Sequence, residues 1–264
     1  MGIFVGKKMS KNLTSYQIVQ EIINLFGNMD LVGLNTDLMN DMAHAIIIEN
    51  GALPYNLGYK PEWAPLPYPK TLCISVNDEI AHGITHGYKL AIGDLVSIDV
   101  GVEKDHLIAD SGRTFAVGEV SEDNKELLYV AERCVKNALS VLKDGVTVLD
   151  IARIVEKTAF RYGKVTNHRL TGHSVDTKMH GDITIPSFVF METMDEKKMY
   201  FQTLKTGDKI CIEPFLTKSD SFGFIDVDGW TIKTRNGDNS AFFEAMVEIT
   251  AGGFKYLVNP FIIN

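Results

Sequence analysis

Four acidic residues and one histidine stand out in this sequence because each lies within a short apolar segment or beside a glycine. They are Asp99, Asp110, His173, Glu213 and Glu244. Carboxylate oxygens and imidazole nitrogens suit divalent metal ions, and carboxylates can bridge two such ions and offset their mutual repulsion. The set therefore predicts two metal ions side by side, an arrangement that serves hydrolytic chemistry.

The first two of these residues lie on a predicted β-hairpin. Asp99 stands in the alternating segment 94–102 and Asp110 in segment 107–115, with a polar turn at 103–106 between them. Alternation lets the two carboxylates face each other across paired strands. Two solvent-exposed aspartates near a turn are the alternative. Because an unpaired buried carboxylate is costly, the apolar surroundings favour a metal partner.

The two glutamates lie in strand-like apolar segments further along the chain. Pro214 follows Glu213 and lacks a backbone donor, so we expect an irregular or edge strand there. Glu248 shares the face of Glu244 by alternation, and we interpret it as the more solvent-exposed of the two. His173 follows a glycine, which lets the backbone approach a crowded site closely. A hydrogen-bonded loop histidine is the alternative for His173.

These side chains need a scaffold, and the apolar periodicity predicts helices and strands in two successive blocks. Helical spacing marks residues 14–26, 37–50, 122–143 and 148–162. Suitable helix ends and N-caps are Gly27, Gly51, Gly145, Gly163, Ser121 and Thr147. Strand patterns dominate 72–118 and 208–258. The repeated blocks predict an α+β fold with approximate internal duplication, in one domain over 1–264 with a short N-terminal extension of about residues 1–11.

Several separated segments resemble type I methionine aminopeptidases of the M24 metallopeptidase family, in the same order along the chain. They are segments 68–77 and 81–84, the hairpin of Asp99 and Asp110, Gly172-His173, Ile212-Glu213-Pro214, segment 229–234 and Phe243-Glu244. The resemblance runs from about residue 36 to residue 258. It implies the pita-bread fold, a pseudo-two-fold antiparallel sheet with flanking helices. It also implies removal of the initiator methionine from nascent proteins when the second residue is small.

The resemblance also implies a role for each metal ligand. Asp110 and Glu244 would bridge two divalent ions, which could be cobalt, manganese, iron or zinc. Asp99 would chelate the second ion, and His173 with Glu213 would hold the first. A water between two such ions loses its proton near neutral pH and yields a hydroxide nucleophile. Glu213 is then the best placed general base.

Further site residues follow from the same resemblance. His82 and His180 match two active-site histidines that hold no metal, and they would polarise the scissile carbonyl and steady the amide nitrogen. Tyr68, Cys73 and Trp230 fall in the walls of the methionine pocket, where a thioether packs well against aromatic edges. For each of these three, an ordinary core position is the alternative.

The sequence departs from the family pattern at several positions, some of them in the loop after His173 that is expected to line the cleft. The departures are Ser174-Val175-Asp176 in place of Gly-Ile-Gly, Met179 in place of an aromatic residue, Gly101 in place of threonine, Ala245-Met246 in place of His-Thr, and the loss of a pocket tyrosine near Pro65. They leave the predicted ligands intact and bear on substrate preference and rate. An additional segment, 182–206, is expected either to shape the cleft or to form a surface loop.

Composition agrees with a soluble enzyme. The chain has 264 residues, 45% of them hydrophobic and 23% charged, and a net charge of −8. This acidity argues against a nucleic-acid groove and against charge-driven membrane binding. Cys73, Cys134 and Cys211 form no disulfide or zinc pattern, which favours the cytoplasm. No apolar run is long enough to span a membrane. We expect a monomer. Its expected partners are N-terminal methionine peptides and nascent chains, and contact with the ribosome is left open.

The remaining histidines have ordinary explanations. His44 falls on a helix, His106 in the hairpin turn and His168 in a polar loop, where solvation or capping is usual. His86 lies four positions after His82, and we interpret it as lying outside the site.

Two alternative functions remain open. A proline-directed dipeptidase or aminopeptidase of the same fold would share the five ligands, although the segments around Cys73 and Trp230 favour the methionine enzyme. A non-catalytic binding protein on this scaffold would be expected to lose ligands, and none is lost. Metal-dependent turnover, rather than metal uptake alone, would distinguish an enzyme from a binding protein.

Overall fold

The computed structural model describes residues 13–175 and 177–263. Its helices are α1 (Ser15–Gly27), α2 (Thr36–Glu49), α3 (Glu122–Leu139), α4 (Val148–Arg161) and α5 (Met194–Tyr200). The first four confirm the predicted helices to within a few residues. The predicted N-terminal extension at about residues 1–11 lies outside the described residues.

Most strands belong to one antiparallel sheet. The strands are β1 (Leu53–Pro54), β2 (Cys73–Val76), β3 (Glu79–Ala81), β4 (Leu95–Lys104), β5 (Leu107–Ala116), β6 (Val165–Thr166), β7 (Thr171–Ser174), β8 (Thr184–Pro186), β9 (Lys209–Ile212), β10 (Phe215–Thr217), β11 (Phe224–Ile225), β12 (Ile232–Lys233), β13 (Ser240–Thr250) and β14 (Gly253–Val258). The large sheet runs in the order β1-β4-β5-β13-β9-β7-β8, with β2, β6, β10 and β14 paired along it. A smaller sheet joins β11, β12 and β3.

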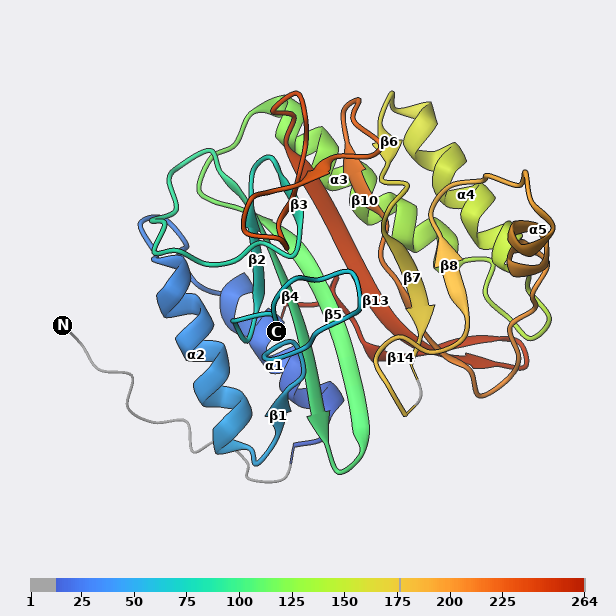
Figure 1. Cartoon of the computed structure of the whole chain (residues 1–264), viewed down its shortest axis with the longest axis horizontal. Coiled ribbons are helices and arrows are strands. Elements are labelled where there is room, and N and C mark those ends of the chain that lie inside the picture. Colours follow the sequence, from blue (N-terminus) through green and yellow to red (C-terminus); the bar gives the residue numbers. More distant parts are fainter. Residues whose placement is uncertain (1–12, 176, 264) are drawn as a thin grey trace.

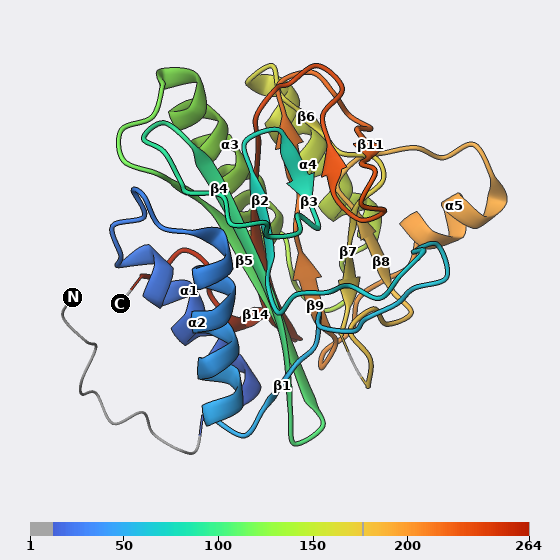
Figure 2. The same ribbon diagram turned by 60° about the vertical axis from the view of Figure 1, so that its left-hand side comes forward.

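The sheet has two halves that meet where β5 pairs with β13. Helix α1 packs on β4 and β5, whereas α3 packs on β13 and β10 and α4 on β8 and β6. Figure 1 shows α1 and α2 with the first half and α3 and α4 with the second. Figure 2 shows α1 and α2 on one side of β4 and β5, and β3 and β11 on the other. The predicted α+β architecture with approximate internal duplication is confirmed.

Alternation along the strands separates a packed face from a functional one. On β4, Val96, Ile98 and Val100 are fully buried in the core that also holds α1 and α2. Asp99 lies between two of them, so its side chain emerges on the opposite face. A second core joins α3 and α4 to β9 and β13 in the same way. The helices therefore cover one face of the sheet, and the other face is free to carry polar side chains.

The β4–β5 hairpin is closed by a turn whose two central residues both have positive φ. These are Asp105 at 51° and His106 at 62°. Two-residue turns of this kind match the right-handed twist of paired strands and fix their register. In that register, Asp99 lies opposite Gly112 and Asp110 lies opposite Gly101. The predicted hairpin is confirmed, and its two carboxylates are diagonal neighbours.

The helix ends follow local hydrogen bonding. Ser121 and Thr147 are the N-caps of α3 and α4, as predicted. Gly51 and Gly163 take positive φ just after α2 and α4, which also agrees with the sequence. The prediction for α3 was too long, because α3 ends at Leu139. The apolar spacing continues past that point in a turn whose side chains still pack into the core.

The predicted irregularity at Pro214 is also present, because β9 ends at Ile212 and β10 begins at Phe215. The additional segment 182–206 forms β8 and α5, and Tyr200 anchors it by donating a hydrogen bond to the carbonyl oxygen of Phe188 at 2.7 Å. None of the helices in the described part of the chain has the length and apolar character needed to span a lipid bilayer.

Candidate active site

The five predicted ligand residues converge on the face of the sheet that the helices leave open. Strand register accounts for this. Glu244 on β13 and Asp99 on β4 both pair with Gly112 of β5, one from each side. Gly112 lies two residues after Asp110 on the same strand, so Asp99 and Glu244 lie on the strands on either side of Asp110. His173 on β7 pairs with Cys211 on β9, two residues before Glu213. Both halves of the sheet therefore contribute side chains to one cluster.

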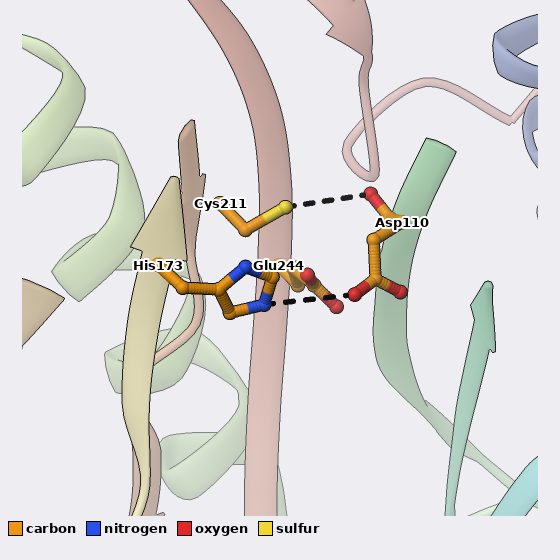
Figure 3. A group of neighbouring side chains, drawn as sticks. All are labelled: Asp110, His173, Cys211 and Glu244. Carbon is orange, nitrogen blue, oxygen red and sulfur yellow. Dashed lines mark hydrogen bonds and ion pairs between the residues drawn. The ribbon is translucent and has the colours of Figure 1, made fainter. Parts of the chain in front are cut away.

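The cluster is tight enough to enclose a metal ion. His173 Nε2 lies 3.4 Å from Glu213 Oε1 and 3.7 Å from Asp110 Oδ2. One ligand atom from each of Asp110, His173, Cys211 and Glu244 lies within 4.8 Å of the others. Figure 3 shows these four side chains pointing toward a common centre.

Cys211 is a member of the cluster that the sequence analysis did not select. Its side chain is fully buried, and Sγ lies 3.8 Å from the carbonyl oxygen of Asp110. One signal for it was present in the sequence, because Cys211 lies two positions before Glu213 in the predicted strand, and alternate residues of a strand share a face. Its other neighbours come from distant strands, which no local pattern reveals.

The electrostatics of the cluster call for a positive partner. Burial raises the pKa of Asp110, Glu213 and Glu244 well above the usual range, and neighbouring carboxylates raise each further. Burial also raises the pKa of Asp99 to about 6. Asp110 Oδ1 and Glu244 Oε1 are buried without a hydrogen-bond partner among the described residues. A carboxylate-rich donor set with unpartnered buried oxygens fits divalent cations.

The cluster forms the floor of a cavity of about 570 Å³. Asp99, Asp110, His173 and Glu213 line this cavity, whereas Glu244 lies beneath its surface with 1% exposure. All of the predicted non-ligand site residues line the same cavity, namely Tyr68, Cys73, His82, His180 and Trp230. The structure therefore brings the whole predicted set together.

The two predicted histidines both line the cavity but have different neighbours. His82 lies 6.0 Å from the Trp230 ring and 6.1 Å from the Trp63 ring, measured between centroids. His180 lies 4.5 Å from the His173 ring. Burial lowers the pKa of both His82 and His180 to about 4, with a smaller contribution from a neighbouring histidine. Both imidazoles are therefore neutral at pH 7, when each can donate one N–H hydrogen bond.

An apolar wall continues from this floor. Tyr68, Cys73 and Trp230 pack together and are each less than 10% exposed. The polar tips of the two aromatic residues are satisfied elsewhere, since Tyr68 Oη lies 2.7 Å from the carbonyl oxygen of Gly83 and Trp230 Nε1 donates to that of Leu66 at 2.9 Å. The rings therefore present apolar surface to the cavity.

Tyr59 and Trp63 are among the aromatic residues of this site that were not predicted from the sequence. Both line the cavity from the loop that joins β1 to β2. The Trp63 ring meets Trp230 edge-on at 4.9 Å, and 52% of the Trp63 side chain remains exposed. This loop has no regular spacing from which a direction for its side chains could be deduced.

The residues that were predicted to lie outside the site, among them Glu248, His44 and His168, do not line the cavity in the described part of the chain. Glu248 pairs with Lys255 and Lys209 near the C-terminal end of β13, four residues after Glu244. His44 Nδ1 lies 2.8 Å from Thr71 Oγ1, and His168 stacks on Phe188 at 4.3 Å. No described residue of segment 182–206 lines the cavity, and its β8 strand joins the large sheet while Ile185 and Tyr200 are buried.

Most of the residues after His173 that depart from the family pattern lie in the described part of the chain. Ser174 Oγ accepts a hydrogen bond from the Ile183 N–H at 3.1 Å, and Val175 is buried in the core. Asp176 lies outside the described residues. Met179 lines the cavity one residue before His180.

Comparison with known proteins gives an independent view of the chain. The sequence profile of metallopeptidase family M24 matches residues 9–251. A methionine aminopeptidase of Aquifex aeolicus is 34% identical over 252 residues, which cover 95% of this chain and 96% of that protein. The crystal structure of methionine aminopeptidase from Rickettsia prowazekii superposes with a TM-score of 0.84 at 27% identity, over 93% of this chain and 94% of that one.

A more distant likeness supports the fold alone. The prolidase from Pyrococcus furiosus superposes with a TM-score of 0.65 at 20% identity, covering 93% of this chain and 61% of that one. Together with the aminopeptidase structures, it confirms the predicted pita-bread architecture.

Proposed function

The chain belongs to metallopeptidase family M24, and on this premise we propose that it is a two-metal aminopeptidase that removes the N-terminal methionine from peptides and nascent proteins with a small second residue. The observation that carries the proposal is the convergence of five potential ligands on the floor of a cavity with an apolar wall. The floor supplies hydrolytic chemistry, and the wall suits an unbranched apolar side chain.

The ligand side chains divide between the two halves of the sheet. Asp110 and Glu244 lie between the others and are the candidates to bridge two ions, with Asp99 on one side and His173 with Glu213 on the other. When bound, divalent ions supply Lewis acidity and lower the pKa of a water molecule. The raised pKa values of the four carboxyl groups are consistent with a site that is completed by positive charge.

Three side chains are placed to handle protons. Glu213 lies at the cavity surface, where its carboxylate can accept a proton from a water molecule held near the cluster and act as the general base. His180 and His82 are neutral N–H donors on the cavity wall, and they can stabilise negative charge that develops on the scissile carbonyl oxygen. Because both are neutral before substrate binds, neither adds repulsion to a bound cation.

Specificity for methionine would come from Tyr68, Cys73 and Trp230. A flexible thioether packs favourably against aromatic edges and a thiol, and the satisfied polar tips of these rings leave no unpaired group to repel it. If the free α-amine of a peptide binds near the floor, only the peptide bond after its first residue reaches the cluster, which would limit cleavage to that residue.

The proposal is tested by release of methionine from a Met-Ala-Ser peptide after reconstitution with manganese or cobalt. Glu244→Gln should abolish release, because it removes charge from a buried side chain that would hold metal. Glu248→Gln is the matched control, since it changes the same residue type on the same strand outside the cavity. An Ala-Pro dipeptide should remain uncut.

Cleavage of Ala-Pro with no methionine release would replace the proposal with a proline-directed dipeptidase of the same fold. Metal binding without turnover on either substrate would favour a binding protein. Equal activity in the Glu244→Gln and Glu248→Gln variants would show that the cluster is not the active centre.

A further inference from the structure

The loop between β1 and β2 touches both candidate catalytic histidines. Figure 1 shows this loop crossing the face of the sheet that the helices leave open. Tyr59 Oη lies 3.0 Å from His180 Nδ1, and the two rings are 5.6 Å apart. Four residues later, Trp63 stacks on His82 with an interplanar angle of 24°. The loop is therefore a structural support for the chemistry as well as a wall of the cavity.

A second tyrosine, Tyr55, anchors the same loop through hydrogen bonds to the backbone. Tyr55 Oη accepts a hydrogen bond from the backbone N–H of Met179 at 3.3 Å. The backbone N–H of Tyr55 donates to the carbonyl oxygen of Gly101 at 2.9 Å. Tyr55 thus ties the loop to β4 and to the segment before His180. It offers a matched comparison for the hydroxyl of Tyr59.

The Tyr59–His180 hydrogen bond has a preferred direction. The contact of 3.0 Å joins a phenol hydroxyl, which carries one proton, to an imidazole nitrogen that can accept it. A phenol is the stronger acid of the two, and an imidazole nitrogen is a stronger acceptor than a phenol oxygen. Tyr59 therefore donates and His180 Nδ1 accepts.

This direction fixes where the single imidazole proton lies. A neutral histidine carries one N–H, and the hydrogen bond made by one ring nitrogen selects the state of the other. With Nδ1 occupied as an acceptor, the proton lies on Nε2, the nitrogen that remains available to a substrate. Without the tyrosine hydroxyl, the Nδ1–H tautomer becomes accessible, and in that tautomer Nε2 can only accept.

We propose that Tyr59 is a positioning residue that holds His180 in the Nε2–H tautomer, so that His180 can donate a hydrogen bond to the reacting carbonyl oxygen. The catalytic consequence rests on the function proposed above. The tautomer itself does not, and it can be measured in protein that has never met a substrate.

The test compares Tyr59→Phe with Tyr55→Phe in protein loaded with diamagnetic zinc. Ring ¹⁵N and ¹³C chemical shifts of His180, assigned with a His180→Asn variant, report the tautomer directly. The wild type and Tyr55→Phe should show the Nε2–H form, and Tyr59→Phe should shift toward a mixture. Both substitutions remove one hydroxyl from the same loop, so a general loosening of the loop would affect both.

Kinetics give the second readout. Tyr59→Phe should lower kcat on the methionine peptide about tenfold with little change in KM, because a bond that forms mainly in the transition state is weakened. An Nδ1–H form in the wild type, or an unchanged tautomer in Tyr59→Phe, would overturn the proposal. If the wild type releases no methionine, the proposed function fails, and the ring shifts alone decide the role of Tyr59.

Discussion

The thioether methyl of Met179 fills the space above Gly101. A β-carbon at position 101 would lie 2.4 Å from Met179 Cε and 2.8 Å from Asn56 Oδ1. Both positions depart from the pattern of the aminopeptidases that the sequence resembles, which have a threonine and an aromatic residue there. The contact shows that these two departures are one packing change, made two residues from Asp99 and one residue from His180.

We expect Gly101→Ala to alter substrate binding more than stability. The nearest obstacles are the far ends of flexible side chains, so the fold can adjust for less than about 2 kcal/mol. The displaced Met179 methyl has to move, and Met179 lines the cavity. KM for a methionine peptide should rise about tenfold.

A double-mutant cycle with Met179→Ala checks this coupling. Removing the thioether first opens the space, so the added methyl should then cost about 1 kcal/mol less in kcat/KM. Additive effects in the cycle would mean that the two positions act separately.

The buried carboxylates should destabilise the metal-free protein, and Asp110→Asn should relieve part of this cost. The pKa of Asp110 is raised by burial first and then by Glu244, Asp99 and Glu213. A carboxyl group with a raised folded pKa binds more protons in the folded state, so its contribution to stability is lost as pH rises above the unfolded value of about 4. Asp110→Asn should therefore raise the free energy of unfolding at pH 8 by about 1 to 2 kcal/mol, and by less at pH 6.

Urea unfolding after chelation, at both pH values, measures this difference. Effects of the buried histidines are common to the two proteins and cancel. Asp182→Asn, at an exposed position, should change neither value. Addition of manganese should reverse the order, because only the wild type gains binding energy. A metal-free variant less stable than the wild type at pH 8 would contradict the argument.

Metal binding should release protons. Asp110, Glu213 and Glu244 have pKa values well above the usual range in the metal-free protein, and that of Asp99 is about 6. Ligands must lose their protons to bind, so affinity should increase between pH 6 and pH 8. The pKa of His173 is lowered, mainly by burial, so this ligand is already neutral and should release none.

Calorimetric titration with manganese at pH 6.5, in two buffers with different ionisation enthalpies, counts these protons. The heats should differ between the buffers by an amount that shrinks as the pH rises. Equal heats in both buffers would show that the carboxylates are already ionised.

The sequence was informative wherever a local pattern sets the structure. Apolar alternation around Asp99 and Asp110 predicted the hairpin, and Ser121 and Thr147 marked two helix starts correctly. The diagonal placement of the two aspartates was not predictable, because it depends on the register that the turn at Asp105 selects.

Contacts between segments that are far apart in the chain could not be predicted from the sequence. Cys211 meets Asp110 only because β9 and β5 both pair with β13. Tyr59 reaches His180 across a separation of 121 positions from an irregular loop. The helix prediction to residue 143 failed because apolar spacing alone cannot distinguish a helix from a turn that continues to pack on the same core.

The backbone conformation of His82 predicts that this position lowers stability but serves activity. His82 has φ 56°, in the left-handed region, and its Nδ1 is buried without a partner among the described residues. The next residue is Gly83, where a β-carbon would lie 2.3 Å from the carbonyl oxygen of Ile74, so the turn cannot relax easily. Strained residues of this kind are retained where function needs them.

His82→Asn should preserve this backbone conformation but lose the imidazole hydrogen bond that the reaction needs. Asparagine adopts positive φ readily and keeps a polar atom near the position of Nδ1, so the free energy of unfolding should stay within about 0.5 kcal/mol. Turnover of a methionine peptide should fall about a hundredfold or more, because a donor to the developing negative charge is lost. His86→Asn, four positions later and exposed, should leave both quantities unchanged. A stability loss above about 1 kcal/mol in His82→Asn would mean that imidazole packing against Trp63 and Trp230 outweighs the backbone strain.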